Sequence, residues 1–255
     1  MGRPVQWLSH DENKVTVEFG DSTADRYDLV IGADGIHSTT RQLIVGARAV
    51  RPVGQIAWRF VTECPPEVTT WTVMLGRHVT FLAVPIGRGR VYCYCDAPTD
   101  GIPELQSADV TRRLAELLSG FAAPAPAILD TLGPDGPVHV APIEEVSLDP
   151  WSYSYGSVLL IGDAAHATSP NMAEGAAMAI EDGLVLADCL ASEPGIAQAV
   201  ARFRARRRPR TQWVMAQTHR RDRTRSLPPA LRNLLLRSWG RNIFHSSYRP
   251  LLQPP

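Results

Sequence analysis

Apolar and polar positions alternate in the first part of the chain and follow helical spacing toward its end. Residues 15–19 and 23–27 are strand-like segments separated by Gly-Asp-Ser, a pattern that predicts a β-hairpin. Tyr27 to Ile31 and Ser157 to Ile161 are mostly apolar, which is typical of parallel strands buried on both faces. The first 50 residues therefore predict a β-meander that leads into a buried strand.

The middle of the chain has strand character. Residues 55–62 and 68–96 are rich in β-branched and aromatic side chains, and Gly87 to Gly89 predicts a turn within them. These segments predict a second, antiparallel sheet that is inserted between the two buried strands.

Helical spacing begins after this sheet. Ser107 is a candidate N-cap for a helix with one apolar face. That face is made by Val110, Leu114, Leu117, Leu118 and Phe121. The stretch that follows, to Pro137, is rich in Pro, Ala and Gly and predicts a loop. Three more helices are expected, at about residues 173–190, 196–222 and 229–244.

This order of elements predicts a mixed α/β fold. An incomplete Rossmann-like domain would carry an inserted antiparallel β-sheet domain and end in C-terminal helices. The expected domain limits are 1–50, 51–150, 151–225 and 226–255.

Both buried strands end in small and acidic residues and turn into a helix, which is where nucleotide cofactors bind in open α/β sheets. Gly162 permits a close turn past a ligand, and Asp163 offers two acceptor oxygens to a diol such as a ribose or ribityl chain. The alternative is that Asp163 only caps the following turn.

Asp34 and Gly35 occupy the matching turn after the first buried strand. Ser38 is placed to cap the short helix that follows, and Arg41 lies within reach of a phosphate or a carboxylate. A strand, turn and serine-capped helix is also a common structural unit, so this turn alone leaves both interpretations open.

Residues 170–175 predict a loop with free amides at the start of the small-residue helix near Ala173. These amides and the positive helix end favour bound negative charge. Ala173 and Gly175 permit close approach of the backbone to a ligand, although a tightly packed Ala-rich helix would need the same small residues.

Residues 28–41 and 158–175 together resemble two fingerprints of the flavoprotein monooxygenases that hydroxylate aromatic rings, the family of para-hydroxybenzoate hydroxylase and salicylate hydroxylase. The order of cofactor segment, substrate sheet and cofactor segment is also that of this family. Members normally open with a Gly-x-Gly-x-x-Gly unit that grips the FAD pyrophosphate, and this sequence contains no such pattern. We therefore expect roughly the first third of a family member to be missing.

The resemblance implies FAD as cofactor, NADH or NADPH as reductant, and O2 and a small aromatic molecule as substrates. Asp34, Gly35 and Arg41 would serve both FAD and the pyridine nucleotide. Gly162 and Asp163 would hold the flavin nucleotide. In this family reduced flavin reacts with O2 to a C4a-hydroperoxide that hydroxylates the ring, and the sequence leaves the catalytic residues unassigned.

The same resemblance places one short segment against the isoalloxazine ring. The segment contains Pro170, Met172, Ala173, Glu174 and Gly175. Many family members have glycine at the position of Ala173. The Met-Ala-Glu-Gly form resembles salicylate hydroxylase-like enzymes and favours a requirement for little bulk there over one for left-handed backbone.

Two other classes of protein remain as alternatives. A non-redox descendant, acting as a cyclase, an isomerase or a binding partner in a biosynthetic pathway, is favoured by the missing glycine unit but opposed by the intact Asp34 and Asp163. An NAD-binding dehydrogenase is disfavoured because it would retain that unit. Two parallel strands alone would leave open edges, so we expect a homo-oligomer or a separately encoded N-terminal half as partner.

Composition narrows the range of partners. The formal net charge is +0 and the pI is about 7.1, which favours neither nucleic acid nor an anionic membrane. No apolar run reaches the roughly 18 residues of a membrane span and no signal peptide is evident, so we expect a cytoplasmic protein. The scattered residues Cys64, Cys93, Cys95 and Cys189 predict free thiols.

Three further features have structural interpretations beside the functional ones. The arginine-rich run from Arg202 to Arg210 predicts a solvated helix face more than a nucleic-acid site. His166 has no evident carboxylate partner in the sequence and is interpreted as structural. Trp58 and Arg59 resemble the family's Trp-Arg at the start of its substrate sheet, where they would either border the pocket or pack in the core.

Overall fold

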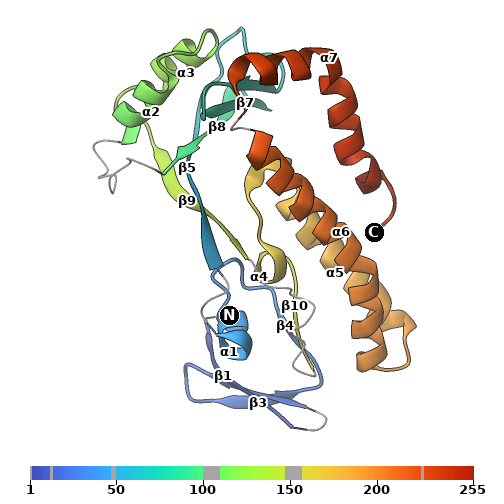
Figure 1. Cartoon of the computed structure of the whole chain (residues 1–255). Helices are drawn as coiled ribbons and strands as arrows, with labels where there is room; N and C mark the ends of the chain where they lie inside the picture. Colours follow the sequence, from blue (N-terminus) through green and yellow to red (C-terminus); the bar gives the residue numbers. More distant parts are fainter. Residues whose placement is uncertain (1, 12–13, 47–49, 100–109, 147–156, 225–226) are drawn as a thin grey trace. The chain divides into compact units, whose positions relative to one another are not determined.

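The computed structural model describes residues 2–11, 14–46, 50–99, 110–146, 157–224 and 227–255. The chain forms two compact units (Figure 1). The first unit consists of Met1–Arg51, Glu144–Thr224 and Leu234–Pro255, and the second of Pro52–Ile143 and Arg225–Asn233. The candidate cofactor turns at residues 34–35 and 162–163 both belong to the first unit.

The first unit contains two small sheets. The antiparallel meander β1-β2-β3 consists of Val5–His10, Val15–Phe19 and Ala24–Tyr27. Strands β4 (Val30–Gly32) and β10 (Val158–Leu160) pair in parallel, with Val30 opposite Val158. The hairpin, the meander and the parallel relationship of the two apolar segments are thereby confirmed.

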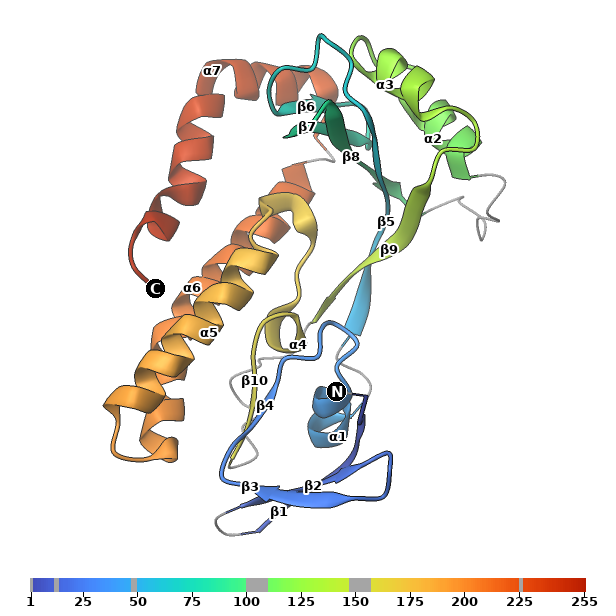
Figure 2. The ribbon, with the colours of Figure 1, turned by 180° about the vertical axis from the view of Figure 1, so that it is seen from behind.

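Helices surround these strands. They are α1 (Thr39–Val45), α4 (Asp163–His166), the 3-10 turn η3 (Pro170–Met172), α5 (Gly175–Ser192) and α6 (Ile196–Thr224). Helices α5 and α6 run side by side in both views (Figures 1 and 2) and bury Leu186 and Phe203 against Leu159 of β10. Helix α7 (Pro229–Tyr248) and the turn η4 (Arg249–Leu252) complete the chain. The helices expected near 173, 196 and 229 are all present.

The second unit is built on a five-stranded sheet in the order β6-β7-β8-β5-β9. These strands are β5 (Val50–Glu63), β6 (Thr72–Leu75), β7 (Thr80–Gly87), β8 (Arg90–Pro98) and β9 (Val138–Val146). Strands β5, β6 and β7 pair antiparallel with their partners, which confirms the expected second sheet and the mixed α/β fold. Trp58, Phe81 and Val91 from the sheet pack in one core with the helices α2 and α3.

Helix α2 (Val110–Leu118) buries Leu114 and Leu118 as its spacing predicts, and its expected cap Ser107 lies outside the described residues. The prediction of a loop up to Pro137 is wrong, because this stretch contains helix α3 (Ala125–Leu132). Proline in the first turn is compatible with a helix start, and Gly133 at the other end adopts a positive φ of 69° that ends the helix. Ile128 is then buried in the core.

Candidate cofactor site

The turn at Gly162 joins β10 to α4 and requires glycine for two reasons. Its φ is +57°, and a Cβ added there would lie 3.1 Å from Cβ of Ala179. The Gly162 amide donates a 2.8 Å hydrogen bond to Oδ2 of Asp182. Asp163 follows as the first residue of α4, and it is exposed. The fold therefore presents an unshielded carboxylate at the carboxyl end of a parallel strand.

The turn at Asp34 and Gly35 is held by its own side chains. Oδ2 of Asp34 accepts hydrogen bonds from the amide and hydroxyl of Thr40 at 2.9 and 3.1 Å, and Oδ1 accepts one from the Ser38 hydroxyl. Ser38 caps α1 as expected, accepting from the Arg41 amide at 2.9 Å. Burial opposes ionisation of Asp34, but these hydrogen bonds hold its pKa below the usual value. Gly35 has a φ of +80°, which favours glycine.

Arg41 connects the two turns. Its side chain is only 1% exposed, and Nη1 donates to the carbonyl of Ala164 at 2.9 Å while Nη2 donates to the carbonyl of Ile36. The guanidinium is therefore bound to backbone carbonyls, and its contact with a phosphate or carboxylate ligand stays a prediction. Its role here is to fix α4 beside the Asp34 turn.

Residues 170–175 form a 3-10 turn and then the start of α5 at Gly175, two residues later than expected. Ala173 has φ and ψ of 56° and 25°, so it lies in the left-handed region. The interpretation that this position requires only little bulk is wrong, because the backbone itself adopts the conformation that favours glycine. The Ala173 amide donates to the Pro170 carbonyl at 2.9 Å.

Helices α6 and α7 clamp this turn through contacts that the sequence did not suggest. The Met172 side chain is buried with Met178 and Val214, and its carbonyl accepts a 3.1 Å hydrogen bond from the Tyr248 hydroxyl. Nη1 of Arg221 donates both to the Asn171 carbonyl at 2.8 Å and to the Tyr248 hydroxyl at 3.1 Å. Met172 thus offers a ligand its backbone and not its side chain.

Glu174 precedes α5 and lies among charged neighbours. Burial raises its pKa, and the Glu181 carboxylate raises it further, against the opposing charges of Arg210 and Arg221. The first amides of α5 have no acceptors within the helix, and the Glu174 side chain does not cap them. The start of α5 therefore keeps its positive character.

His166 has a carboxylate partner after all. Its Nε2 lies 2.7 Å from Oδ2 of Asp182, and both side chains are buried. Sixteen residues separate the two along the chain, so only the packing of α4 against α5 brings them together. The sequence signal that was missed is an acidic residue inside an apolar, small-residue helix, where burial requires a partner.

The expectation of a solvated face for the arginine run is confirmed for Arg202 and Arg208, which are exposed, but not for Arg207. Arg207 is 0% exposed, and its Nε donates to Oδ1 of Asp182 at 2.7 Å. Arg207 and Arg210 both bind the Glu181 carboxylate, each with a contact of 2.7 Å. These arginines join α6 to α5, and this use of their charge is structural.

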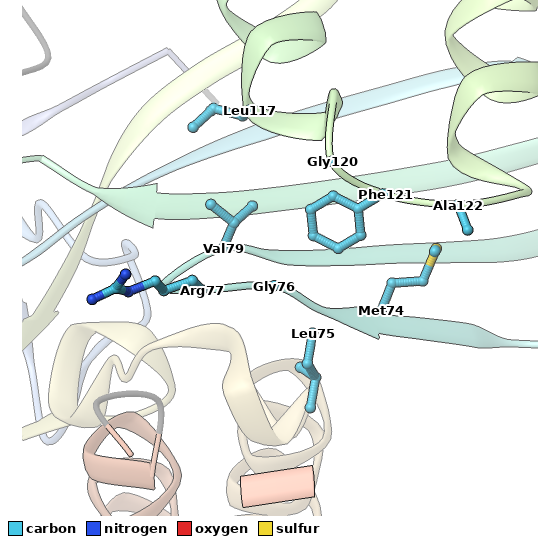
Figure 3. Close-up of a pocket in the computed structure, with 9 residues that line it drawn as sticks. All are labelled: Met74, Leu75, Gly76, Arg77, Val79, Leu117, Gly120, Phe121 and Ala122. Atoms are coloured by element: carbon cyan, nitrogen blue, oxygen red, sulfur yellow. The ribbon is translucent and has the colours of Figure 1, made fainter. Parts of the chain in front are cut away.

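A separate cavity of about 450 Å³ lies within the second unit (Figure 3). Met74, Val79 and Phe121 line it, and Arg77 is the charged side chain among its lining residues. Trp58, on β5 of the same unit, is fully buried in the core, whereas the Arg59 guanidinium lies 5.6 Å from the centre of the Tyr94 ring. Trp58 therefore packs as a core residue.

Other candidate chemistry is limited. The four cysteines are free thiols, as expected, and the described residues contain no cluster of His, Cys, Asp and Glu that fits a metal ion. Burial raises the pKa of Cys93 to about 12, with a smaller contribution from Cys64. Among the helices in the described part of the chain, none has both the length and the apolar character for crossing a membrane.

Two parallel strands that end in a Gly-Asp turn and an Asp-Gly turn, each followed by a helix, define an α/β fold of the nucleotide-cofactor class. Comparison with known proteins specifies the class. Residues 1–218 match the model of the FAD binding domain, and the chain belongs to this FAD-binding family.

Relatives of this chain include proteins named as monooxygenases and a protein solved with FAD. The chain is 29% identical over 228 residues to Aurachin C monooxygenase/isomerase of Stigmatella aurantiaca, covering 86% of this chain and 57% of the relative. It is 31% identical over 244 residues to 3-amino-4-hydroxybenzoate 2-monooxygenase of Streptomyces cremeus, covering 88% and 55%. Klebsiella pneumoniae HpxO complexed with FAD and uric acid superposes with a TM-score of 0.81 at 26% identity, covering 95% of this chain and 62% of that one. The chain thus spans somewhat more than half the length of these relatives.

The residues present fit FAD. At Gly162 the absence of a side chain leaves room that any Cβ would reduce. A Cβ at Gly175 would lie 3.9 Å from Oδ1 of Asp163, so the Asp163 carboxylate and the start of α5 are neighbours. A carboxylate suits the hydroxyls of a ribityl or ribose chain, and unpaired helix amides suit the electron-rich edge of a flavin.

Proposed function

We propose that this chain is the FAD- and substrate-binding part of a monooxygenase that hydroxylates a small aromatic molecule. The observation that carries the proposal is the Gly162 turn with the exposed Asp163 beside the uncapped start of α5. Membership of the FAD-binding family and the resemblance to aromatic monooxygenases support it.

We propose the following roles for the residues of the site. The Asp163 carboxylate accepts hydrogen bonds from hydroxyls of the flavin nucleotide, and the Gly162 turn gives the nucleotide room. The backbone of Pro170, Ala173 and Gly175 faces the flavin ring, where the start of α5 stabilises negative charge. Bound FAD supplies the redox and oxygen chemistry, so the chain itself needs to supply position and exclusion of water.

The remaining cofactor-site residues also shape the site around the ligand. Asp34 and Gly35 shape the neighbouring turn, and Arg41 ties it to α4 through the Ala164 carbonyl. Met172 fixes the backbone of the flavin-facing turn, because its carbonyl accepts the hydrogen bond from Tyr248. Glu174 contributes to the charge of that turn. We place the substrate in the unit that carries the five-stranded sheet.

The proposed reaction uses NADH or NADPH as reductant and O2 as oxidant. Relatives named for urate, 6-hydroxynicotinate and 3-amino-4-hydroxybenzoate support a small, electron-rich ring as substrate. The free thiols of the chain are consistent with the reducing cytoplasm, where we propose that the protein acts.

We also propose that the protein associates, either with a second copy or with a separately encoded segment. In the part of the chain that the structure describes, the parallel sheet has two strands, and Ile31 on β4 is 42% exposed. Such a sheet leaves unpaired edges that favour added strands. The mass of the purified chain in solution tests this, and a stable monomer with ordinary thermal stability would contradict it.

The function itself is tested by incubating the purified chain with FAD, desalting it and recording its visible absorbance. Retained bands near ~370 and ~450 nm, typical of oxidised flavin, are expected. The loaded protein should then oxidise NADH or NADPH in the presence of O2, faster when a hydroxylated aromatic acid is added. A folded protein that stays colourless, also when it is joined by the partner segment proposed above, would contradict the proposal and favour a non-redox role.

A further inference from the structure

We propose that Asp182 is a positioning residue that holds the Gly162 turn, and with it the Asp163 carboxylate, in the geometry that receives FAD. This inference rests on the proposed function. It concerns a residue on α5 that lies behind the turn and does not itself face the ligand.

Three donors from three different segments converge on the Asp182 carboxylate. Oδ2 accepts from the Gly162 amide at 2.8 Å and lies 2.7 Å from Nε2 of His166, and Oδ1 accepts from Nε of Arg207 at 2.7 Å. Asp182 is 0% exposed, so no water competes for these bonds. One side chain therefore joins the turn before α4, the end of α4 and the middle of α6.

The bond to Gly162 matters because this glycine has little conformational restraint of its own. Its φ of +57° and ψ of −143° belong to a region open essentially to glycine, and glycine samples many other conformations as easily. Ala179 limits the turn from one side, at 3.1 Å from the place of a Cβ. The Asp182 carboxylate supplies the directional contact that selects the observed conformation.

Aspartate is required here, and asparagine is not equivalent. A carboxylate has two oxygens that only accept, which matches three donors, whereas the amide of asparagine would present two N–H groups of its own toward one of them. The charge also balances Arg207, which is fully buried. Replacing Asp182 by Asn therefore disturbs the Gly162 contact even where the fold survives.

Glu181 provides a matched control. It is the preceding residue on α5 and binds the same Arg207, with Nη1 at 2.7 Å from its carboxylate. None of its hydrogen bonds in the described structure goes to the Gly162 turn. The variant E181Q thus weakens the same helix pairing without touching the proposed positioning contact.

The test measures the FAD dissociation constant of the full chain by flavin fluorescence, together with hydrogen exchange of the Gly162 amide without FAD. We expect D182N to weaken FAD binding about tenfold or more and to speed exchange at Gly162, because a hydrogen bond to a charged group is lost. We expect E181Q to leave exchange at Gly162 within about twofold of wild type and to weaken FAD binding much less than D182N does, because it lacks the contact to the Gly162 turn.

Equal losses in D182N and E181Q, or unchanged FAD affinity in a folded D182N, would overturn the proposal. If D182N does not fold, Asp182→Glu keeps the charge for Arg207 but shifts the carboxylate, and it is judged by the same two measurements. If wild type itself fails to bind FAD, the proposed function fails. The amide exchange then still decides whether Asp182 holds the turn, since only D182N should lose protection at Gly162.

Discussion

Ala173 is the residue whose conformation departs most from what its side chain prefers within the candidate site. It holds a φ of +56° at the end of η3, and a left-handed non-glycine residue costs roughly 1–2 kcal/mol. The fold accepts this cost because α6 and α7 hold the turn through the carbonyls of Asn171 and Met172.

Replacing Ala173 by glycine should therefore stabilise the protein. We expect A173G to raise the free energy of unfolding by about 0.5–1 kcal/mol, after allowance for the greater freedom of glycine in the unfolded chain. Urea unfolding of wild type and A173G measures this difference in the free energy of unfolding. The control A187G, at an exposed position inside α5, should instead lose about 1 kcal/mol. Destabilisation of both variants alike would show that Ala173 is not strained.

Cys93 gives a second prediction at this scale. Its pKa is raised to about 12 by burial and by Cys64, so roughly one molecule in ten thousand carries the reactive thiolate at pH 8. We expect a thiol reagent at pH 8 to modify the partly exposed Cys64 in the native protein while Cys93 stays unmodified until guanidinium is added. Peptide mapping by mass spectrometry distinguishes the two, and comparable labelling rates would contradict the burial of Cys93.

Single elements were predictable where spacing alone decides them. The meander, the parallel strands and the helices α2, α5 and α6 follow from apolar periodicity, because each buries one face or one stripe. Helix α7 was also predicted, although its large apolar side chains such as Leu234 and Trp239 are exposed. Helix α3 was missed because its prolines lie where a helix begins, a position that composition alone does not distinguish from a loop.

Contacts between elements were not predictable. His166 and Asp182 meet only through the packing of α4 on α5, and Arg207 reaches Asp182 from α6. Neither spacing nor composition encodes these pairings. The sequence analysis therefore missed the residues that support the turns from behind, and its assignment of the ligand-side residues stays a prediction.

The clamp by α7 on the flavin-facing turn can be tested directly. Y248F removes the hydroxyl that donates to the Met172 carbonyl and accepts from Arg221. We expect a loss of about 0.5–1.5 kcal/mol in the free energy of unfolding, together with weaker FAD binding. Y27F is the control, since the Tyr27 hydroxyl has only a 3.4 Å contact on an exposed strand. Similar small losses of stability in Y248F and Y27F would contradict the role of Tyr248 in holding this turn.

At the scale of the whole molecule, the buried Asp182 makes stability depend on pH. Burial by itself would raise the pKa of Asp182, but His166, the Gly162 amide and Arg207 hold it below the usual value. Because the pKa is lower in the folded than in the unfolded chain, the carboxylate stabilises the fold above about pH 4, and this contribution is lost as the pH falls further.

Wild type should therefore lose stability more steeply than D182N between about pH 4 and pH 2. Urea unfolding at a series of pH values measures the two slopes. Glu181 faces the same Arg207, so E181Q is measured alongside as a control for the loss of a negative charge beside this arginine. Parallel slopes for wild type and D182N would contradict the depressed pKa.

The central claim is that the Asp163 turn receives FAD, and an equilibrium FAD titration of wild type, D163A and D130A tests it most directly. Asp130 is an exposed carboxylate on α3 in the other unit, and its variant controls for the change of charge. We expect D163A to lose about tenfold or more in affinity while D130A binds as wild type does. Equal FAD affinity in all three proteins would contradict the assignment of the site.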